Sequence, residues 1–215
     1  MIENTNTEPI TVLIVDDHPV FRQGLESLVG TQEDMRVVGA VDNASEALTR
    51  AASEPPDLIL LDLRLADTNG LEILTEIQLL PKPPKVLIVS SHEGDAMVSR
   101  ALKAGAGGYV SKNAPASELL SAIRKVHSGI RALSKDISRN VAASIGLPTL
   151  TPREVEIIEQ VSAGMSNKEV AAHLGLSEKT VKNHLNSVFV KLDASDRTHA
   201  VMLAIERGII GPHPA

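Results

Sequence analysis

Leu58-Ile59-Leu60-Leu61-Asp62 is an uninterrupted apolar run that ends directly in a carboxylate. A run of this length without polar alternation is typical of a strand buried on both faces, as in a parallel sheet covered by helices. Val86–Val89 is a second run of the same kind. Together the two runs indicate a parallel sheet with helices on both of its faces.

The first 128 residues alternate between short β-branched runs and amphipathic helical stretches. The expected strands are Thr11–Val15, Arg36–Val41, Asp57–Leu61, Lys85–Ser90 and Gly108–Val110. The expected helices, in which apolar residues recur at helical spacing, are Pro19–Val29, Ala44–Ser53, Gly70–Leu80, Asp95–Ala104 and Pro115–His127. Five strand–helix repeats predict an α/β fold with a five-stranded, doubly wound parallel sheet.

The pattern changes after this region. Glycines and a proline mark a connecting segment with a short helix expected near Asp136–Ser144, and from Thr149 the pattern is helical only. We therefore assign residues 8–128 to a first domain, 129–148 to a linker and 149–215 to a second domain. A length of 215 residues is sufficient for two domains that each bury a core.

Helix start signals divide the second domain. Thr151-Pro152-Arg153-Glu154 and Ser166-Asn167-Lys168-Glu169 are capping boxes, in which a hydroxyl and a glutamate open a helix together. The second of these helices stops at Gly175, and Ser177 opens a third that runs to about Leu192. A fourth helix is expected at about Ser195–Arg207. A short helix, a glycine-containing turn and a longer helix indicate a helix-turn-helix within a four-helix, all-α domain.

Composition narrows the class of protein. The absence of cysteine excludes disulfides and thiolate metal sites. No apolar run approaches the roughly 18 residues of a membrane span, and the polar start, Met1 to Pro9, lacks the pattern of a signal peptide. We expect a cytoplasmic protein without a membrane partner. The net charge is −6 and neither domain is basic, so a contact with nucleic acid must rest on a local patch.

Polar side chains follow four of the expected strands. Asp16 and Asp17 follow the first, and Asp62 follows the third; Ser90 ends the fourth and Lys112 follows the fifth. Carboxyl ends of parallel strands meet at one edge of an open sheet. Three carboxylates gathered there need a cation between them, and oxygen ligands favour Mg²⁺. A single Asp after a strand is usually a turn former or cap, but the combination indicates a site. We assign no role to the neighbouring histidine of the first turn.

These residues resemble the receiver domain of response regulators over about residues 10–128. The matching segments are Val12-Leu13-Ile14-Val15-Asp16-Asp17-His18, Leu60-Leu61-Asp62-Leu63-Arg64, Val89-Ser90 and Gly108-Tyr109-Val110-Ser111-Lys112. The resemblance implies a flavodoxin-like sheet. Ala66 and Asn113 stand where many receivers have proline, which removes no chemical group from the site.

The resemblance also implies a role for each site residue. Asp62 would accept a phosphoryl group from a partner histidine kinase, and Lys112 would contact the phosphoryl oxygens. Asp17, Asp62 and the backbone carbonyl of Arg64 would bind Mg²⁺, with Asp16 assisting through water. Ser90 and Tyr109 would form the switch pair that responds to phosphorylation.

The third helix of the second domain has two contrasting faces. At about 100° per residue, its apolar side chains fall within one arc and pack on the domain. The opposite arc carries Lys179, Lys182, Asn183, Asn186 and Val190, and no acidic residue. A solvated face is the usual meaning of such an arc, but Lys and Asn also suit phosphates and base edges in the major groove.

The helical segments from Leu150 to His184 resemble the LuxR-type helix-turn-helix, over about residues 149–210. With a receiver, this is the arrangement of the NarL/FixJ family. The resemblance implies base contacts from Lys182, Asn183 and Asn186, and a dimer contact through the last helix. It also implies contacts to DNA phosphates from Lys179, Thr180, His184 and Lys191.

The expected function is that of a two-component response regulator, not an enzyme: phosphorylation of Asp62 would switch DNA binding and homodimer formation. A phosphorylation-independent DNA binder with a vestigial receiver is the alternative. A small-molecule sensor is disfavoured because few aromatic residues are available to line a pocket. An aspartate-dependent phosphohydrolase would need a second carboxylate at the position of Arg64.

Overall fold

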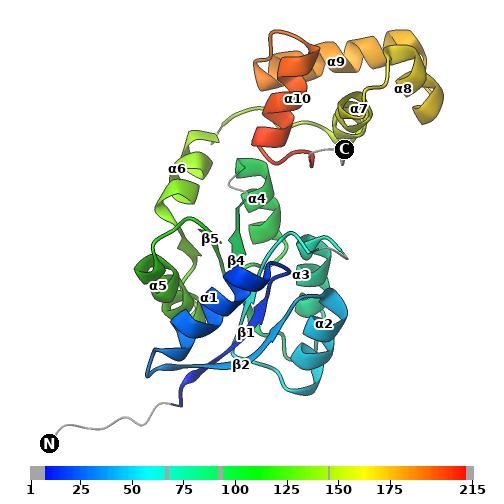
Figure 1. The fold of residues 1–215 in the computed structure, drawn as a ribbon. Coiled ribbons are helices and arrows are strands. Elements are labelled where there is room, and N and C mark those ends of the chain that lie inside the picture. The colour runs from blue at the N-terminus through cyan, green and yellow to red at the C-terminus, as the bar shows by residue number, and fades with distance from the viewer. Residues whose placement is uncertain (1–7, 66–67, 92–93, 145, 212–215) are drawn as a thin grey trace, which may run out of the picture. The chain divides into compact units, whose positions relative to one another are not determined.

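The structure is a computed structural model that describes residues 8–65, 68–91, 94–144 and 146–211. The chain divides into two compact units, one built around a sheet and one formed by helices (Figure 1). The division falls within the helix α6, Lys135–Ser144, of the predicted linker. Of the residues singled out from the sequence, Ala66 lies outside the described part of the chain.

The first unit is a parallel sheet in the strand order β2-β1-β3-β4-β5-β6. Its strands are β1 Ile10–Val15, β2 Met35–Val41, β3 Leu58–Leu61, β4 Lys85–Ser90, β5 Gly108–Ser111 and β6 Ala132–Leu133. Its helices are α1 Pro19–Gly30, α2 Ala44–Ser53, α3 Gly70–Gln78, α4 Asp95–Lys103 and α5 Ala116–His127. All pairings are parallel, so the predicted doubly wound fold is confirmed.

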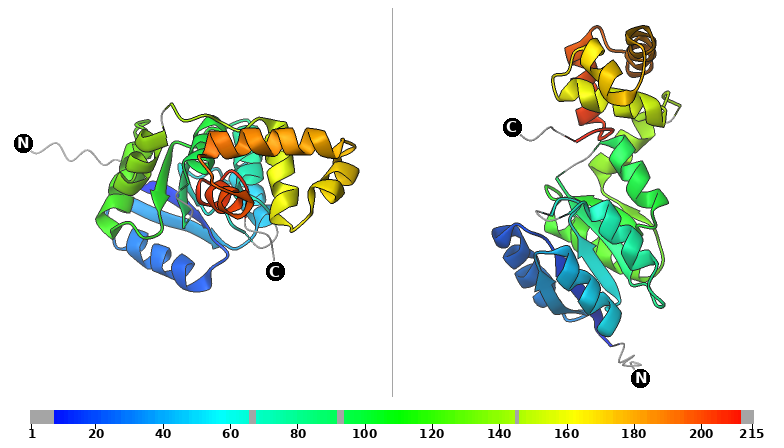
Figure 2. Two further views of the ribbon diagram at one scale, coloured as in Figure 1. Left: turned by 90° about the horizontal axis from the view of Figure 1, so that it is seen from above. Right: turned by 90° about the vertical axis from the view of Figure 1, so that its right-hand side faces the viewer.

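Helices cover both faces of this sheet (Figures 1 and 2). One face packs on α1 and α5 through a core that includes Ile14, Leu60 and Val110 from the strands and Leu25 and Ile123 from the helices. Successive side chains of a strand point to opposite faces. The central strand β3 is therefore buried over its whole length, which is why its sequence is continuously apolar.

The prediction of five strands was wrong by one. The sheet has a sixth strand, β6, which pairs in parallel with β5 through Gly108↔Ala132 and Tyr109↔Leu133. It lies in the segment that the sequence assigned to a linker. Two residues are too short to show a hydrophobic period, so the strand is defined by its pairing and not by its own sequence.

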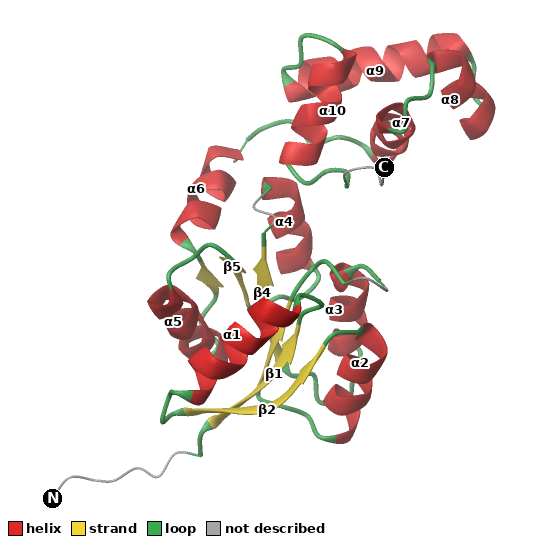
Figure 3. Cartoon of the chain, viewed as in Figure 1, coloured by secondary structure: helices red, strands yellow, loops and turns green. Residues whose placement is uncertain are grey.

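The second unit consists of the helices α7 Pro152–Ser162, α8 Asn167–Leu174, α9 Glu178–Leu192 and α10 Arg197–Glu206 (Figure 3). Both predicted capping boxes are present, at Thr151 and Ser166. Gly175 takes a left-handed conformation, with φ of 66°, and ends α8. The four-helix prediction is confirmed. No helix in the described ranges combines the length and apolar character that a membrane span requires.

Candidate metal-binding crevice and nucleic-acid interface

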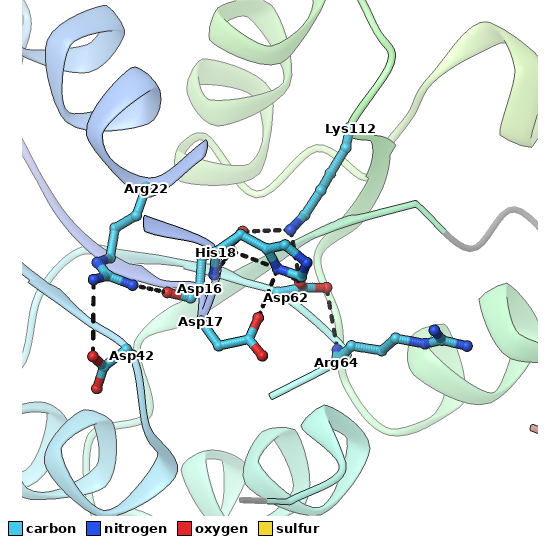
Figure 4. Close-up of polar contacts among 8 residues, drawn as sticks. All are labelled: Asp16, Asp17, His18, Arg22, Asp42, Asp62, Arg64 and Lys112. Atoms are coloured by element: carbon cyan, nitrogen blue, oxygen red, sulfur yellow. Dashed lines mark hydrogen bonds and ion pairs between the residues drawn. The ribbon is translucent and has the colours of Figure 1, made fainter. Parts of the chain in front are cut away.

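Two buried carboxylates lie side by side at the carboxyl edge of the sheet (Figure 4). Asp16 follows β1 and Asp62 follows the neighbouring strand β3, and both are almost fully buried. The backbone N–H of Asp62 donates to the carbonyl of Val15 at 2.9 Å, which fixes the two strand ends relative to each other. Strand pairing therefore brings together acids that are 46 positions apart in sequence.

Lys112 supplies the positive charge between these acids. Its Nζ lies 2.6 Å from Oδ2 of Asp16 and 2.7 Å from Oδ2 of Asp62, and its side chain is only 10% exposed. The ammonium also lies 4.5 Å from the centroid of the Phe21 ring, close enough for a cation–π interaction. The sequence thus correctly placed Lys112 beside the acids, and one ammonium offsets part of the repulsion between the two carboxylates.

Asp17 offers an oxygen that the protein leaves available. Its Oδ1 is buried and makes no hydrogen bond within the described part of the chain, although Nδ1 of His18 lies 2.7 Å away. Asp17 does not cap α1: the N-cap residue is His18, and no side chain caps that helix. A buried carboxylate oxygen without a hydrogen bond is an unfavourable arrangement unless a cation binds it.

The donor atoms fit a divalent metal ion. Ligand atoms of Asp16, Asp17, His18 and Asp62 all lie within 4.8 Å of one another. The three carboxylates are the ligands that Mg²⁺ prefers, and Asp17 contributes one carboxylate oxygen to this cluster. His18, which is exposed, is a neighbour that the sequence reasoning set aside. The sequence feature that could have identified His18 as part of this cluster is its position directly after the acid pair.

The loop after Asp62 is held close to the crevice. The backbone N–H of Arg64 donates to Oδ1 of Asp62 at 3.1 Å, while the Arg64 side chain extends away (Figure 4). Gly70, the first residue of α3, donates its N–H to the carbonyl of Leu63 at 3.0 Å. A Cβ at Gly70 would lie 2.5 Å from Cα of Leu63 and 2.6 Å from the carbonyl oxygen of Asp62. Only glycine allows this approach, a requirement that the sequence reasoning missed.

Ser90 and Tyr109 lie on the adjacent strands β4 and β5, and both side chains are completely buried. The backbone N–H of Lys112 donates to the carbonyl of Ser90 at 2.9 Å, which links the ends of the two strands. Tyr109 is one of the switch pair that the family resemblance implies, and its movement on phosphorylation stays a prediction. In this conformation its ring is already buried in the interior of the receiver.

The α9 helix presents the two faces that its sequence predicts. Its buried side chains are Val181, Leu185, Val188 and Leu192. Four of the predicted DNA contacts, Lys179, Lys182, Asn183 and Asn186, are exposed together on the other side, and Thr180 and His184 are partly exposed. Thr180 also shares a hydrogen bond with the hydroxyl of Ser177 at 2.8 Å. The geometry leaves the predicted reading face free of acidic residues.

Lys191 differs from the other predicted DNA contacts because its side chain forms an ion pair within the domain. Its Nζ lies 2.6 Å from Oε2 of the buried Glu154, whose Oε1 accepts from the hydroxyl of Ser187 at 2.6 Å. Burial opposes ionisation of Glu154, but the hydrogen bonds from Lys191, Ser187 and Thr151 outweigh it and lower its pKa from 4.5 to about 2. Glu154 therefore joins the start of α7 to α9. The phosphate contact of Lys191 stays a prediction.

Known proteins share both units. The family of response regulator receiver domains matches residues 12–124, and the luxR family of bacterial regulatory proteins matches residues 148–204. The response regulator protein VraR of Staphylococcus epidermidis is 37% identical over 206 residues, which cover 94% of this chain and 99% of VraR.

The nitrate/nitrite response regulator protein NarL of Escherichia coli is 35% identical over 209 residues, which cover 92% of this chain and 96% of NarL. The crystal structure of the response regulator ChrA, of a heme-sensing two-component system, aligns with a TM-score of 0.56 and 32% identity. That alignment covers 95% of this chain and all of the ChrA chain. The chain belongs to the NarL/FixJ family of response regulators, with a receiver domain followed by a LuxR-type helix-turn-helix domain.

Proposed function

We propose that Asp62 accepts a phosphoryl group from a cognate histidine kinase, with Mg²⁺ bound by Asp17, Asp62 and the carbonyl of Arg64, and by Asp16 through water. Phosphorylation then promotes homodimer formation and sequence-specific DNA binding by the second domain, which regulates transcription in the cytoplasm. The observation that carries this proposal is the convergence of three carboxylates and Lys112 on one crevice.

The chain's own groups account for the transfer. A carboxylate oxygen of Asp62 attacks phosphorus, so that an O–P bond forms while the P–N bond to the donor histidine breaks and the imidazole keeps the electron pair. Mg²⁺, when bound, neutralises charge on the phosphoryl oxygens. Lys112, now 2.7 Å from Asp62, is near enough to pair with a phosphoryl oxygen. The added charge and acceptor oxygens then favour a different arrangement of the neighbouring strands.

A labelling experiment tests the phosphoacceptor. The full chain is incubated with acetyl phosphate and Mg²⁺, and the mass of the intact protein is measured. We expect wild type to gain one phosphoryl group and Asp62→Asn to gain none. Asp57→Asn is the matched control, because Asp57 precedes the same strand and its carboxylate accepts hydrogen bonds from the N–H and the hydroxyl of Thr11. Equal labelling of wild type and Asp62→Asn would contradict the assignment.

Two further measurements, of phosphate-ester turnover and of DNA affinity with and without phosphorylation, separate the rival functions. Repeated turnover of phosphate esters would favour a phosphohydrolase, although Arg64 stands where that chemistry needs a carboxylate. Labelling without a change in DNA affinity would favour a phosphorylation-independent regulator. The exposed face of α9 supports base contacts by Lys182, Asn183 and Asn186 and a phosphate contact by Lys179. We also propose phosphate contacts by the partly exposed Thr180, His184 and Lys191.

A further inference from the structure

The sixth strand ties the predicted switch strand to the linker. In β6, the N–H of Ala132 donates to the carbonyl of Gly107 at 3.2 Å, and directly after the strand the N–H of Ser134 donates to the carbonyl of Tyr109 at 3.0 Å. The residue that the family resemblance names as a switch therefore shares its backbone hydrogen bonding with the segment that leads out of the receiver. A displacement of β5 acts directly on β6.

Ser134 extends this connection through its side chain. It is 2% exposed, and its Oγ accepts from the backbone N–H of Ser111 at 3.4 Å. Its carbonyl accepts from the N–H of Ser138 at 2.8 Å, in the first turn of α6. Ser134 thus bonds to β5 through both backbone and side chain, and to α6 through its carbonyl.

The other end of this chain of contacts is the phosphoacceptor. Lys112 directly follows Ser111 and binds Asp62, and the N–H of Asn113 donates to Oγ of Ser111 at 3.1 Å. A phosphoryl group that pairs with the Lys112 ammonium changes the forces on the end of β5. Few bonds separate that strand end from Ser134.

We propose that β6 with Ser134 is the coupling element that transmits the state of Asp62 to the linker helix α6. This inference rests on the proposed function, because it needs phosphorylation as the input. Glu118 is the natural comparison: its Oε1 accepts from the N–H of Lys135 at 2.8 Å, which anchors the linker to α5 and not to β5. Ser134 acts through its neighbours and touches no reacting atom.

Hydrogen exchange of the full chain tests the coupling without an operator sequence. Beryllofluoride with Mg²⁺ serves as the phosphoryl mimic, and amide exchange is followed in peptides that cover residues 130–139 and the segment around Asp62. In wild type we expect the mimic to slow exchange in both peptides. In Ser134→Ala the Asp62 peptide responds as in wild type, while the response of the linker peptide falls about three- to tenfold, the range for one lost hydrogen bond.

Two controls and a second variant sharpen the test. Ser138→Ala removes an exposed hydroxyl four residues away, and Glu118→Ala loosens the linker from α5; both are expected to keep the wild-type linker response. Ala132→Pro removes the N–H that bonds to Gly107, and it should reduce the linker response independently of Ser134. It serves as the test if Ser134→Ala does not fold.

The outcomes are distinct. A wild-type linker response in folded Ser134→Ala and Ala132→Pro overturns the coupling role, and so does a wild-type protein in which only the Asp62 peptide responds. Loss of the linker response in Glu118→Ala or Ser138→Ala to the same extent also overturns it, because the effect would then be general loosening. A wild-type protein in which neither peptide responds contradicts the proposed function itself.

Discussion

At the scale of single residues, the structure depends most on positions where a side chain, or the absence of one, holds two segments in place relative to each other. Gly70 allows the start of α3 to touch the backbone of the phosphoacceptor loop. Glu154 links two helices of the second domain through one buried carboxylate. Neither residue was assigned its three-dimensional role from sequence, because both roles depend on contacts between segments.

Gly70→Ala is expected to destabilise the receiver by about 1–3 kcal/mol, because backbone atoms 2.5 and 2.6 Å from the new Cβ have to shift. The shift displaces the loop that follows Asp62, so the labelling rate with acetyl phosphate should also fall. Urea unfolding and intact-mass labelling measure the two effects. Gly24→Ala, with open space around the added Cβ, is the matched control and should behave as wild type or be more stable.

The lowered pKa of Glu154 predicts acid sensitivity of the second domain. Because the folded-state pKa of about 2 lies below the ordinary 4.5, its stabilisation is complete above about pH 4.5 and is lost as pH falls toward 2. The loss amounts to about 3 kcal/mol. Glu154→Gln should remove this part of the pH dependence and lower stability at neutral pH by about 2 kcal/mol. Thermal unfolding of this variant and of wild type between pH 2 and pH 7 is the measurement.

At the scale of elements, periodicity predicted most helices and strands to within one or two residues. The bounds of β4, α2 and α9 are those expected, since each has a clear hydrophobic period and a definite start or stop signal. The sheet edge was predicted least well, because β6 has no period of its own. The proximity of the acids and Lys112 was predicted correctly because strand ends in a parallel sheet fix their place, while their chemical roles stay predictions. The ion pair of Lys191 with Glu154 was not predicted, because the two residues are distant in sequence.

The exposed face of α9 predicts which substitutions impair DNA binding. Asn183→Ala or Asn186→Ala should weaken binding to a fragment selected from random DNA by about 1–3 kcal/mol and relax its sequence preference. Lys179→Ala should weaken binding to all sequences alike and reduce the slope of log affinity against log salt by about one. Fluorescence anisotropy at several salt concentrations measures both. Glu159→Ala, an exposed change on α7, is the control, and equal loss of affinity there would contradict the assignment.

At the scale of the whole molecule, two separate hydrophobic cores support two separate tasks. One lies between the sheet and helices α1 and α5, and the other lies among α7 to α10. A ligand that binds only the folded receiver stabilises that domain by mass action.

Calorimetry of the full chain should therefore show two transitions. Beryllofluoride with Mg²⁺ is expected to raise the receiver transition by several degrees, because about 100-fold excess over the dissociation constant adds about 2.7 kcal/mol. The helical domain should shift much less. In Asp62→Asn the mimic should move neither transition. A shift of the helical domain equal to that of the receiver would contradict two independent cores.

The chain contains no tryptophan and one tyrosine, Tyr109, which is completely buried in β5. When the protein is excited at wavelengths that its two phenylalanines do not absorb, its ultraviolet emission comes from Tyr109, at the position where the switch is expected to act. A change in the surroundings of this ring appears in the intrinsic fluorescence of the unlabelled protein. Because aromatic residues are scarce, the fluorescence of the unmodified protein can report on the switch position.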